Sequence, residues 1–157
     1  MRHIKLFKPY IPLACLFITA CATVETTTEL TQTYFSEKVF VAERSRVWEA
    51  AKRSVTGIGA TLVSADGQNY VLMFQKTVPF NELPAYATMP TGLFIKKSTP
   101  LEVQVELQEA SAQTRVMARP RYVIKGNGAF LLPQSYILAS NGKLEKEFLD
   151  NLSKNLK

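Results

Sequence analysis

The sequence predicts an α+β domain in which an antiparallel β-sheet is packed by an early helix and a C-terminal helix. The first observation is a strict alternation over residues 100–108, where apolar residues at every second position are separated by glutamate or glutamine. This pattern is typical of a strand with one buried face. The second observation is a pair of amphipathic stretches with helical spacing, over residues 45–56 and 140–156. Strands flanked by two such helices predict a sheet that is covered on one face.

The early helix is expected to start at Ser45, which would act as its N-cap, and to end at Gly57 and Gly59. Its apolar residues recur at spacings of three and four and form one stripe: Trp48, Ala51, Val55 and Ile58. We expect Trp48, the single tryptophan, to pack this helix onto the sheet, and stacking on a ligand is the alternative role.

Five stretches before residue 126 have the pattern of β-strands. Residues 38–42 form a short strand before the helix, and residues 60–64 and 70–76 form a hairpin around an Asp-Gly turn. Residues 100–108 and 114–124 form a second hairpin.

The inward-facing residues of the second hairpin predict its register. Pairing them sets Leu107 opposite Thr114 and Val105 opposite Val116, which places Glu106 opposite Arg115 and Glu102 opposite Arg119. We therefore interpret the three arginines of the second strand as a neutralised face in contact with solvent, with an anion-binding stripe as the alternative. These arginines are Arg115, Arg119 and Arg121.

The C-terminal part predicts a turn, an irregular or edge strand and a helix. Residues 126–128 form the turn, and Pro133 interrupts the strand over residues 129–139. Ser140 or Asn141 would cap the helix. Its apolar face comprises Leu144, Phe148, Leu149, Leu152 and Leu156, and its polar face comprises Lys143, Glu147, Asp150 and Lys154.

Residues 77–99 have no periodicity and contain three prolines. Long connections of this kind are often functional. Their apolar side chains are a candidate surface for a partner or for a lipid chain: Phe80, Leu83, Tyr86, Met89 and Phe94. The alternative is a loop that folds over one end of the core.

The N-terminal residues predict where the protein resides. A basic leader over residues 1–12 precedes an apolar segment over residues 13–20, and eight residues are fewer than the ~20 that cross a bilayer. The run Leu16-Phe17-Ile18-Thr19-Ala20-Cys21 resembles a bacterial lipoprotein signal. The resemblance implies that Cys21 becomes the first residue and carries diacylglycerol and palmitate. Because Ala22 replaces the aspartate of lipoproteins that stay in the inner membrane, it also implies the outer membrane.

Ordinary secretory cleavage is the alternative at this position. Ala20, Cys21 and Ala22 also fit a small-x-small site, which would release a soluble protein that begins at Thr23. With lipoprotein cleavage, the chain divides into a signal peptide over residues 1–20, a threonine-rich tether over residues 21–36 and one domain over residues 37–157. For the tether, the alternative is that its distal half joins a sheet edge, because threonine favours strands.

The composition argues against several classes of site. Cys15 and the single histidine, His3, belong to the expected signal peptide, and lipid would occupy Cys21, so the mature domain would contain neither a free thiol nor an imidazole. Ser-His-Asp, Cys-His and His/Cys metal sites then cannot form, and we expect no enzyme, no metal and no cofactor. Of the 19 Lys and Arg residues, three lie in the leader, which leaves 16 against 13 Asp and Glu. This excess is too small to indicate nucleic acid binding.

The helix segment Val47-Trp48-Glu49-Ala50-Ala51, the hairpin over residues 59–75 and the amphipathic C-terminal stretch resemble one helix-grip module of the BamC lipoproteins. These lipoproteins belong to the machinery that assembles outer-membrane β-barrels. They contain two such modules, whereas this chain has room for one. The resemblance therefore implies a helix-grip-like fold, and it does not extend to membership in that machinery.

Three functions remain after these exclusions. The first is a non-enzymatic interaction or assembly module that faces the periplasm at the outer membrane and binds an envelope protein. The second is a periplasmic carrier that holds a lipid or a small apolar ligand between helix and sheet. The third is an enzyme that works through carboxylates alone, although no pair of acidic residues indicates one.

Overall fold

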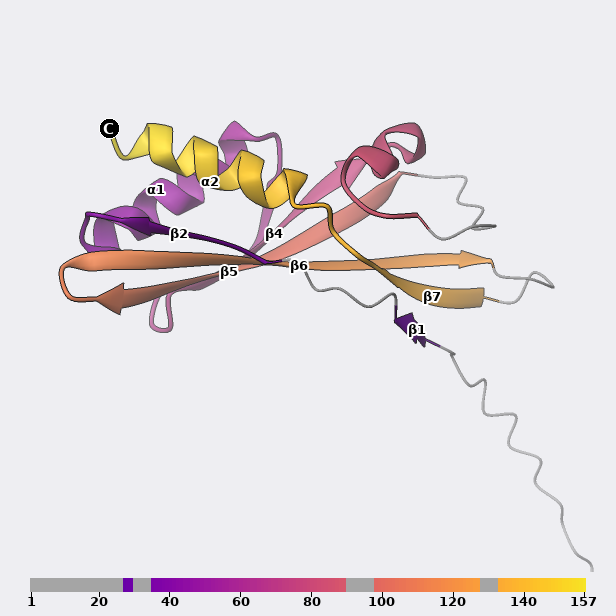
Figure 1. Ribbon diagram of the computed structural model, residues 1–157, viewed down its shortest axis with the longest axis horizontal. Coiled ribbons are helices and arrows are strands. Elements are labelled where there is room, and N and C mark those ends of the chain that lie inside the picture. Colours follow the sequence, from indigo (N-terminus) through magenta and orange to yellow (C-terminus); the bar gives the residue numbers. More distant parts are fainter. Residues whose placement is uncertain (1–26, 30–34, 90–97, 128–132) are drawn as a thin grey trace, which may run out of the picture.

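The structure, a computed structural model, describes residues 27–29, 35–89, 98–127 and 133–157 (Figure 1). Its strands are β1 (Thr27–Glu29), β2 (Ser36–Phe40), β3 (Thr61–Asp66), β4 (Val71–Val78), β5 (Thr99–Ala110), β6 (Gln113–Asn127) and β7 (Pro133–Leu138). Its helices are α1 (Arg44–Gly57), the 3-10 helix η1 (Phe80–Ala85) and α2 (Lys143–Asn155). The predicted fold class is confirmed: an antiparallel sheet is packed by an early helix and a C-terminal helix in a helix-grip-like arrangement.

Strand β6 is the centre of the sheet. The strand order is β1-β7-β6-β5-β4-β3, and β2 pairs with β6 beside this path. Residues 114–118 of β6 pair with β2, whereas residues 122–127 pair with β7. Strands β2 and β7 therefore occupy successive parts of one edge of β6. The pairs are antiparallel except for that between β1 and β7, which is parallel.

Both α-helices lie on the same face of the sheet, and the core lies between the two layers (Figure 1). The predicted inward face of β5 is confirmed, because its alternating apolar residues are buried: Leu101, Val103, Val105 and Leu107. The stripe of α1 is buried at Trp48, Ala51 and Val55. Apolar burial of this kind is the main source of the stability of such a fold.

The end of α1 follows the sequence prediction, but its start does not. Gly59 has a φ of +69°, and its N–H donates to the carbonyl of Thr56 while the N–H of Ala60 donates to that of Val55. These two bonds form a Schellman motif, which favours glycine at this position. The expected cap at Ser45 is wrong: the helix begins at Arg44, after an N-cap residue whose side chain makes no capping bond.

The predicted register of the second hairpin is wrong by two residues. Val116, and not Thr114, lies opposite Leu107, and Arg121 lies opposite Glu102. The reason is the turn, which consists of Ser111 and Ala112 alone, both with positive φ values of 43° and 61°. Alternation determines which face each residue occupies, but the length of the turn determines which residues pair.

Several boundaries also differ from the prediction. Strand β2, which corresponds to the strand predicted over residues 38–42, starts at Ser36, two residues before the expected start. Gly126 and Asn127 continue β6 and do not turn, because Gln134 and Pro133 of β7 pair with them. Strand β1 lies within the predicted tether and pairs with β7. No helix in the described parts of the chain is long and apolar enough to cross a membrane.

Candidate functional site

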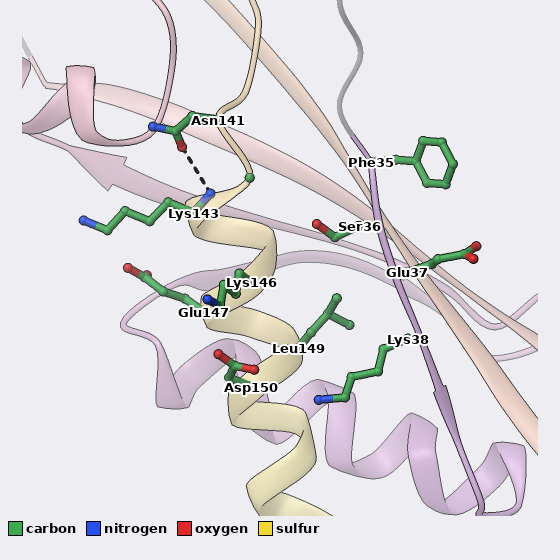
Figure 2. A pocket seen from close by; sticks show the side chains of 11 residues that line it. Phe35, Ser36, Glu37, Lys38, Asn141, Lys143, Lys146, Glu147, Leu149 and Asp150 are labelled. Atoms are coloured by element: carbon green, nitrogen blue, oxygen red, sulfur yellow. Dashed lines mark hydrogen bonds between the residues drawn. The ribbon is translucent and has the colours of Figure 1, made fainter.

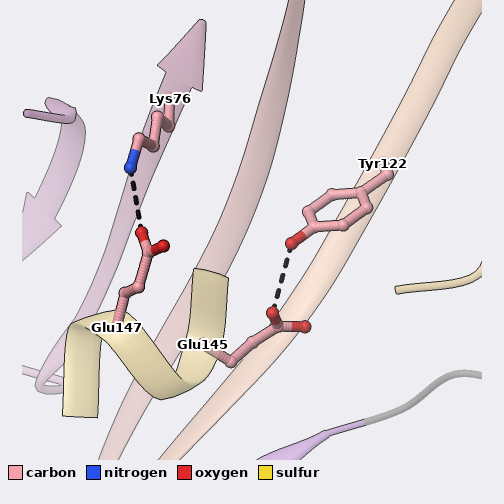
Figure 3. A network of polar contacts seen from close by, with 4 residues as sticks. All are labelled: Lys76, Tyr122, Glu145 and Glu147. Atoms are coloured by element: carbon pink, nitrogen blue, oxygen red, sulfur yellow. Dashed lines mark hydrogen bonds and ion pairs between the residues drawn. The ribbon is translucent and has the colours of Figure 1, made fainter. Parts of the chain in front are cut away.

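A buried tyrosine and a buried carboxyl join α2 to the sheet. The hydroxyl of Tyr122 on β6 donates a hydrogen bond of 3.2 Å to Oε2 of Glu145 in the first turn of α2 (Figure 3). Glu145 is completely buried and Tyr122 is 1% exposed. Solvent therefore reaches neither group.

Burial governs the ionisation of both groups. It raises the pKa of Glu145, and hydrogen bonds from Ser140, from the backbone and from Tyr122 offset the increase only in part. Burial and the neighbouring charge of Glu145 likewise raise the pKa of Tyr122, so the phenol keeps its proton and remains a donor. A raised carboxyl pKa can mark an active site, but Glu145 does not line the groove beside α2 that is described below.

A second polar contact holds α2 from the neighbouring strand. Nζ of Lys76 on β4 lies 2.9 Å from Oε2 of Glu147, and both side chains are at least two-thirds buried (Figure 3). Burial lowers the pKa of Lys76, but the contacts with Glu147 and Tyr86 outweigh this effect and raise it overall. The ammonium groups of Lys76 and Lys143 lie 5.4 Å and 4.4 Å from the centre of the Tyr86 ring. These contacts position the start of α2 on the sheet.

Aromatic side chains fill the space beneath the helices. The rings of Phe74 on β4 and Phe148 on α2 have centroids 5.1 Å apart, and both residues are completely buried. Trp48 meets the ring of Tyr70 edge-on at 5.6 Å, as expected for a residue that packs α1 onto the sheet. Because Phe74 and Phe148 fill the space between α2 and the sheet, their packing argues against an apolar ligand at that position.

An open groove lies between β2 and the first half of α2 (Figure 2). Its volume is about 660 Å³. Acidic, basic and apolar residues line it together: Phe35, Ser36, Glu37, Lys38, Asn141, Gly142, Lys143, Lys146, Glu147, Leu149 and Asp150. Three lysines balance three carboxylates, so the groove has no net preference for anions or cations.

Polar contacts shape both ends of this groove. Oδ1 of Asn141 accepts the N–H of Lys143 at 3.1 Å (Figure 2). The expected cap at Ser140 or Asn141 is nevertheless wrong, because the N-cap residue of α2 is Gly142, and no side chain makes the capping bond. Nζ of Lys38 donates to Oγ of Ser153 at 2.8 Å and so links β2 to α2 beyond the groove.

Strand β2 pairs with β6 on one side, and among the described residues no strand pairs with its other side. Such an edge exposes unpaired backbone N–H and C=O groups.

In the described part of residues 77–99, the apolar side chains do not form one exposed surface. Leu83 is completely buried and Tyr86 is 6% exposed, because η1 directs them into the core, and Met89 packs against that core. The prediction that Leu83, Tyr86 and Met89 belong to an exposed surface is therefore wrong. The alternative, a loop that folds over one end of the core, describes these three residues. Phe80 is 39% exposed, and Phe94 and Cys21 lie outside the described residues.

The sequence prediction missed the buried carboxyl of Glu145. A signal for it exists, because Glu145 precedes Phe148, Leu149 and Leu152 by three, four and seven residues and so lies on the apolar stripe of the helix. The groove has no comparable signal, because its two sides are about 100 residues apart in the sequence.

Within the described residues, no three His, Cys, Asp or Glu side chains gather as metal ligands would.

No family model and no curated protein matches this chain. Among solved structures, the Thermus thermophilus protein TTHA0849 is similar over 80% of this chain and 97% of its own, with 12% identity and a TM-score of 0.39. A TBP-like protein from Parabacteroides distasonis is similar over 66% of this chain and 64% of its own, with 7% identity and a TM-score of 0.33. The di-domain ARO/CYC StfQ from the steffimycin biosynthetic pathway is similar over 79% of this chain and 43% of its own, with 9% identity and a TM-score of 0.35. Likenesses this distant carry no argument about function.

Proposed function

We propose that this protein is a lipid-anchored envelope protein of the outer membrane that acts as a non-enzymatic interaction module. In this proposal its domain faces the periplasm, and the groove between β2 and α2 receives an extended segment of an envelope protein. The observation that carries the proposal is the open groove beside the unpaired edge of β2.

The chemistry of the groove fits a polypeptide better than an apolar ligand. An added strand could pair its backbone with the edge of β2, which is a common mode of peptide recognition. Leu149 and Phe35 offer apolar contacts, while lysines and carboxylates of both signs lie along the same walls. The filled space beneath α2 supports this choice over a carrier of lipid or of another apolar ligand.

The lipid anchor rests on the sequence around Cys21. An apolar segment, small residues and a cysteine follow one another as in lipoproteins. The intact mass of the protein extracted from its native membrane tests this part. A mass that matches triacylated Cys21 supports the anchor, and a mature chain that begins at Thr23 contradicts it.

Photo-crosslinking in cells tests the interaction module. A photoreactive phenylalanine replaces Glu37 or Asp150, which are exposed on opposite walls of the groove, or Arg53, an exposed control on α1. We expect the same protein adduct from both groove positions and no such adduct from position 53. Equal labelling at all three positions, or a small lipid as the sole adduct, would contradict a groove that binds a protein.

A further inference from the structure

The second half of β6 presents basic and apolar side chains on the face of the sheet opposite the helices. Tyr122 and Ile124 are each 1% exposed and point into the core. Because side chains alternate along a strand, Arg121, Val123 and Lys125 point the other way, and all three are exposed. Both helices lie beyond the opposite face of the sheet (Figure 1).

The charges of this region are only partly compensated. Lys125 lies opposite Ser135, and Val123 lies opposite Ile137, so β7 supplies no acidic partner to either residue. The acidic residue Glu29 of β1 lies opposite Ile137. Arg121 lies opposite Glu102, but no ion pair joins them in the described structure. By contrast, Arg119 approaches Glu106 at 3.9 Å. We refer to Arg121, Val123, Lys125 and Ile137 as the β6 patch.

The position of the proposed anchor places this patch near a membrane. Cys21 precedes Thr27 of β1 by six residues, which span at most ~20 Å when fully extended. Strand β1 pairs with β7, and β7 pairs with the part of β6 that contains the patch. An acyl chain on Cys21 would therefore hold the β6 patch within a short distance of the lipid headgroups.

We propose that the β6 patch rests on the anionic lipid leaflet that holds the acyl chains and thereby orients the domain. This inference rests on the proposed lipid anchor. Arg121 and Lys125 attract anionic headgroups over roughly 10 Å. In this orientation Val123 and Ile137 lie at the level of the lipid headgroups. The acyl chains supply the affinity, so the patch needs to contribute only orientation. The helix-covered face then points away from the membrane, and the groove beside α2 remains open to a partner.

Fluorescence quenching on vesicles tests this orientation. The full lipoprotein carries a fluorophore on Val123→Cys, or on Val63→Cys as a matched control that is also about half exposed but lies in the edge strand β3. Acylation blocks Cys21, so the introduced thiol reacts alone. The vesicles contain phosphatidylcholine with or without phosphatidylglycerol, together with a lipid that carries a quencher on its headgroup.

We expect headgroup quenching at position 123 to exceed that at position 63 by at least about two-fold in anionic vesicles, and to fall in high salt, where charges are screened. The double variant Arg121→Ser, Lys125→Ser should remove the difference. Its control, Arg53→Ser, Lys154→Ser, loses two exposed charges from the helices and should retain the difference.

Two negative outcomes are distinguishable. A protein that floats with the vesicles but is quenched equally at positions 63 and 123 overturns the orientation and leaves the anchor in place. A protein that does not float with the vesicles overturns the proposed anchor and the orientation together.

Discussion

The hydroxyl of Tyr122 donates a hydrogen bond of 3.2 Å to the carboxyl of Glu145, and this bond joins β6 to the first turn of α2 inside the core. We expect Tyr122→Phe to lower the free energy of unfolding by about 1–3 kcal/mol, because the buried carboxyl loses a donor. Chemical denaturation of Tyr122→Phe, of Glu145→Gln and of the double variant that combines them would measure the coupling energy between the two side chains. Strictly additive effects would show that the bond contributes nothing.

The buried carboxyl of Glu145 predicts a pH dependence of stability. Burial raises its pKa above the ordinary value of 4.5, so between these two pKa values the folded protein binds more protons than the unfolded chain. The contribution of Glu145 to stability is therefore largest below the ordinary pKa and declines as the pH rises through the raised one.

Glu145→Gln should remove this decline. We expect the stability of the variant relative to the parent to increase as the pH rises from about 4 to 7. Denaturation curves across this range provide the measurement, with Glu82→Gln as a control at an exposed position. A parallel pH dependence of parent and Glu145→Gln would contradict a raised pKa.

The ion pair between Lys76 and Glu147 should stabilise the packing of α2 on β4. We expect Lys76→Met to lower the free energy of unfolding by about 1 kcal/mol, because Glu147 then lacks its partner at a position that is two-thirds buried. The pair of Glu49 and Lys52 is a suitable comparison, because its carboxylate is exposed, and Lys52→Met should have a smaller effect. The pKa of Lys76 is raised above 10.5, so its contribution should persist at neutral pH and disappear only in strong alkali.

The turn between β5 and β6 is strained at Ala112, where φ is +61°. Glycine adopts this conformation without steric cost, and we expect Ala112→Gly to raise the free energy of unfolding by about 0.5–1 kcal/mol. Thermal and chemical denaturation would measure the change. Ala110→Gly is the control, because Ala110 is the last residue of β5 and has no positive φ, so glycine should not stabilise the protein there.

Much of the candidate site could not be predicted because it depends on residues that are distant in the sequence. The helical spacing of Phe148 and Leu152 predicts the buried face of α2, but it does not show that β2 crosses beside that helix. The opposite walls of the groove meet only because β2 and β7 share one edge of β6. Leu83 and Tyr86 lie in a stretch without periodicity, so their burial depends on how η1 packs against the core.

The sequence by itself determined the fold class, the inward face of β5 and the glycine that ends α1. These features follow from local physics: a strand has a period of two, a helix has a period of 3.6, and positive φ favours glycine. The tertiary structure alone decided the register of β5 and β6, the contact of Glu145 with Tyr122 and the groove beside β2. Registers that differ by two residues bury the same side chains, so only the two-residue turn at Ser111 and Ala112 separates them. A carboxyl on an apolar stripe likewise acquires its partner only when helix and sheet come together.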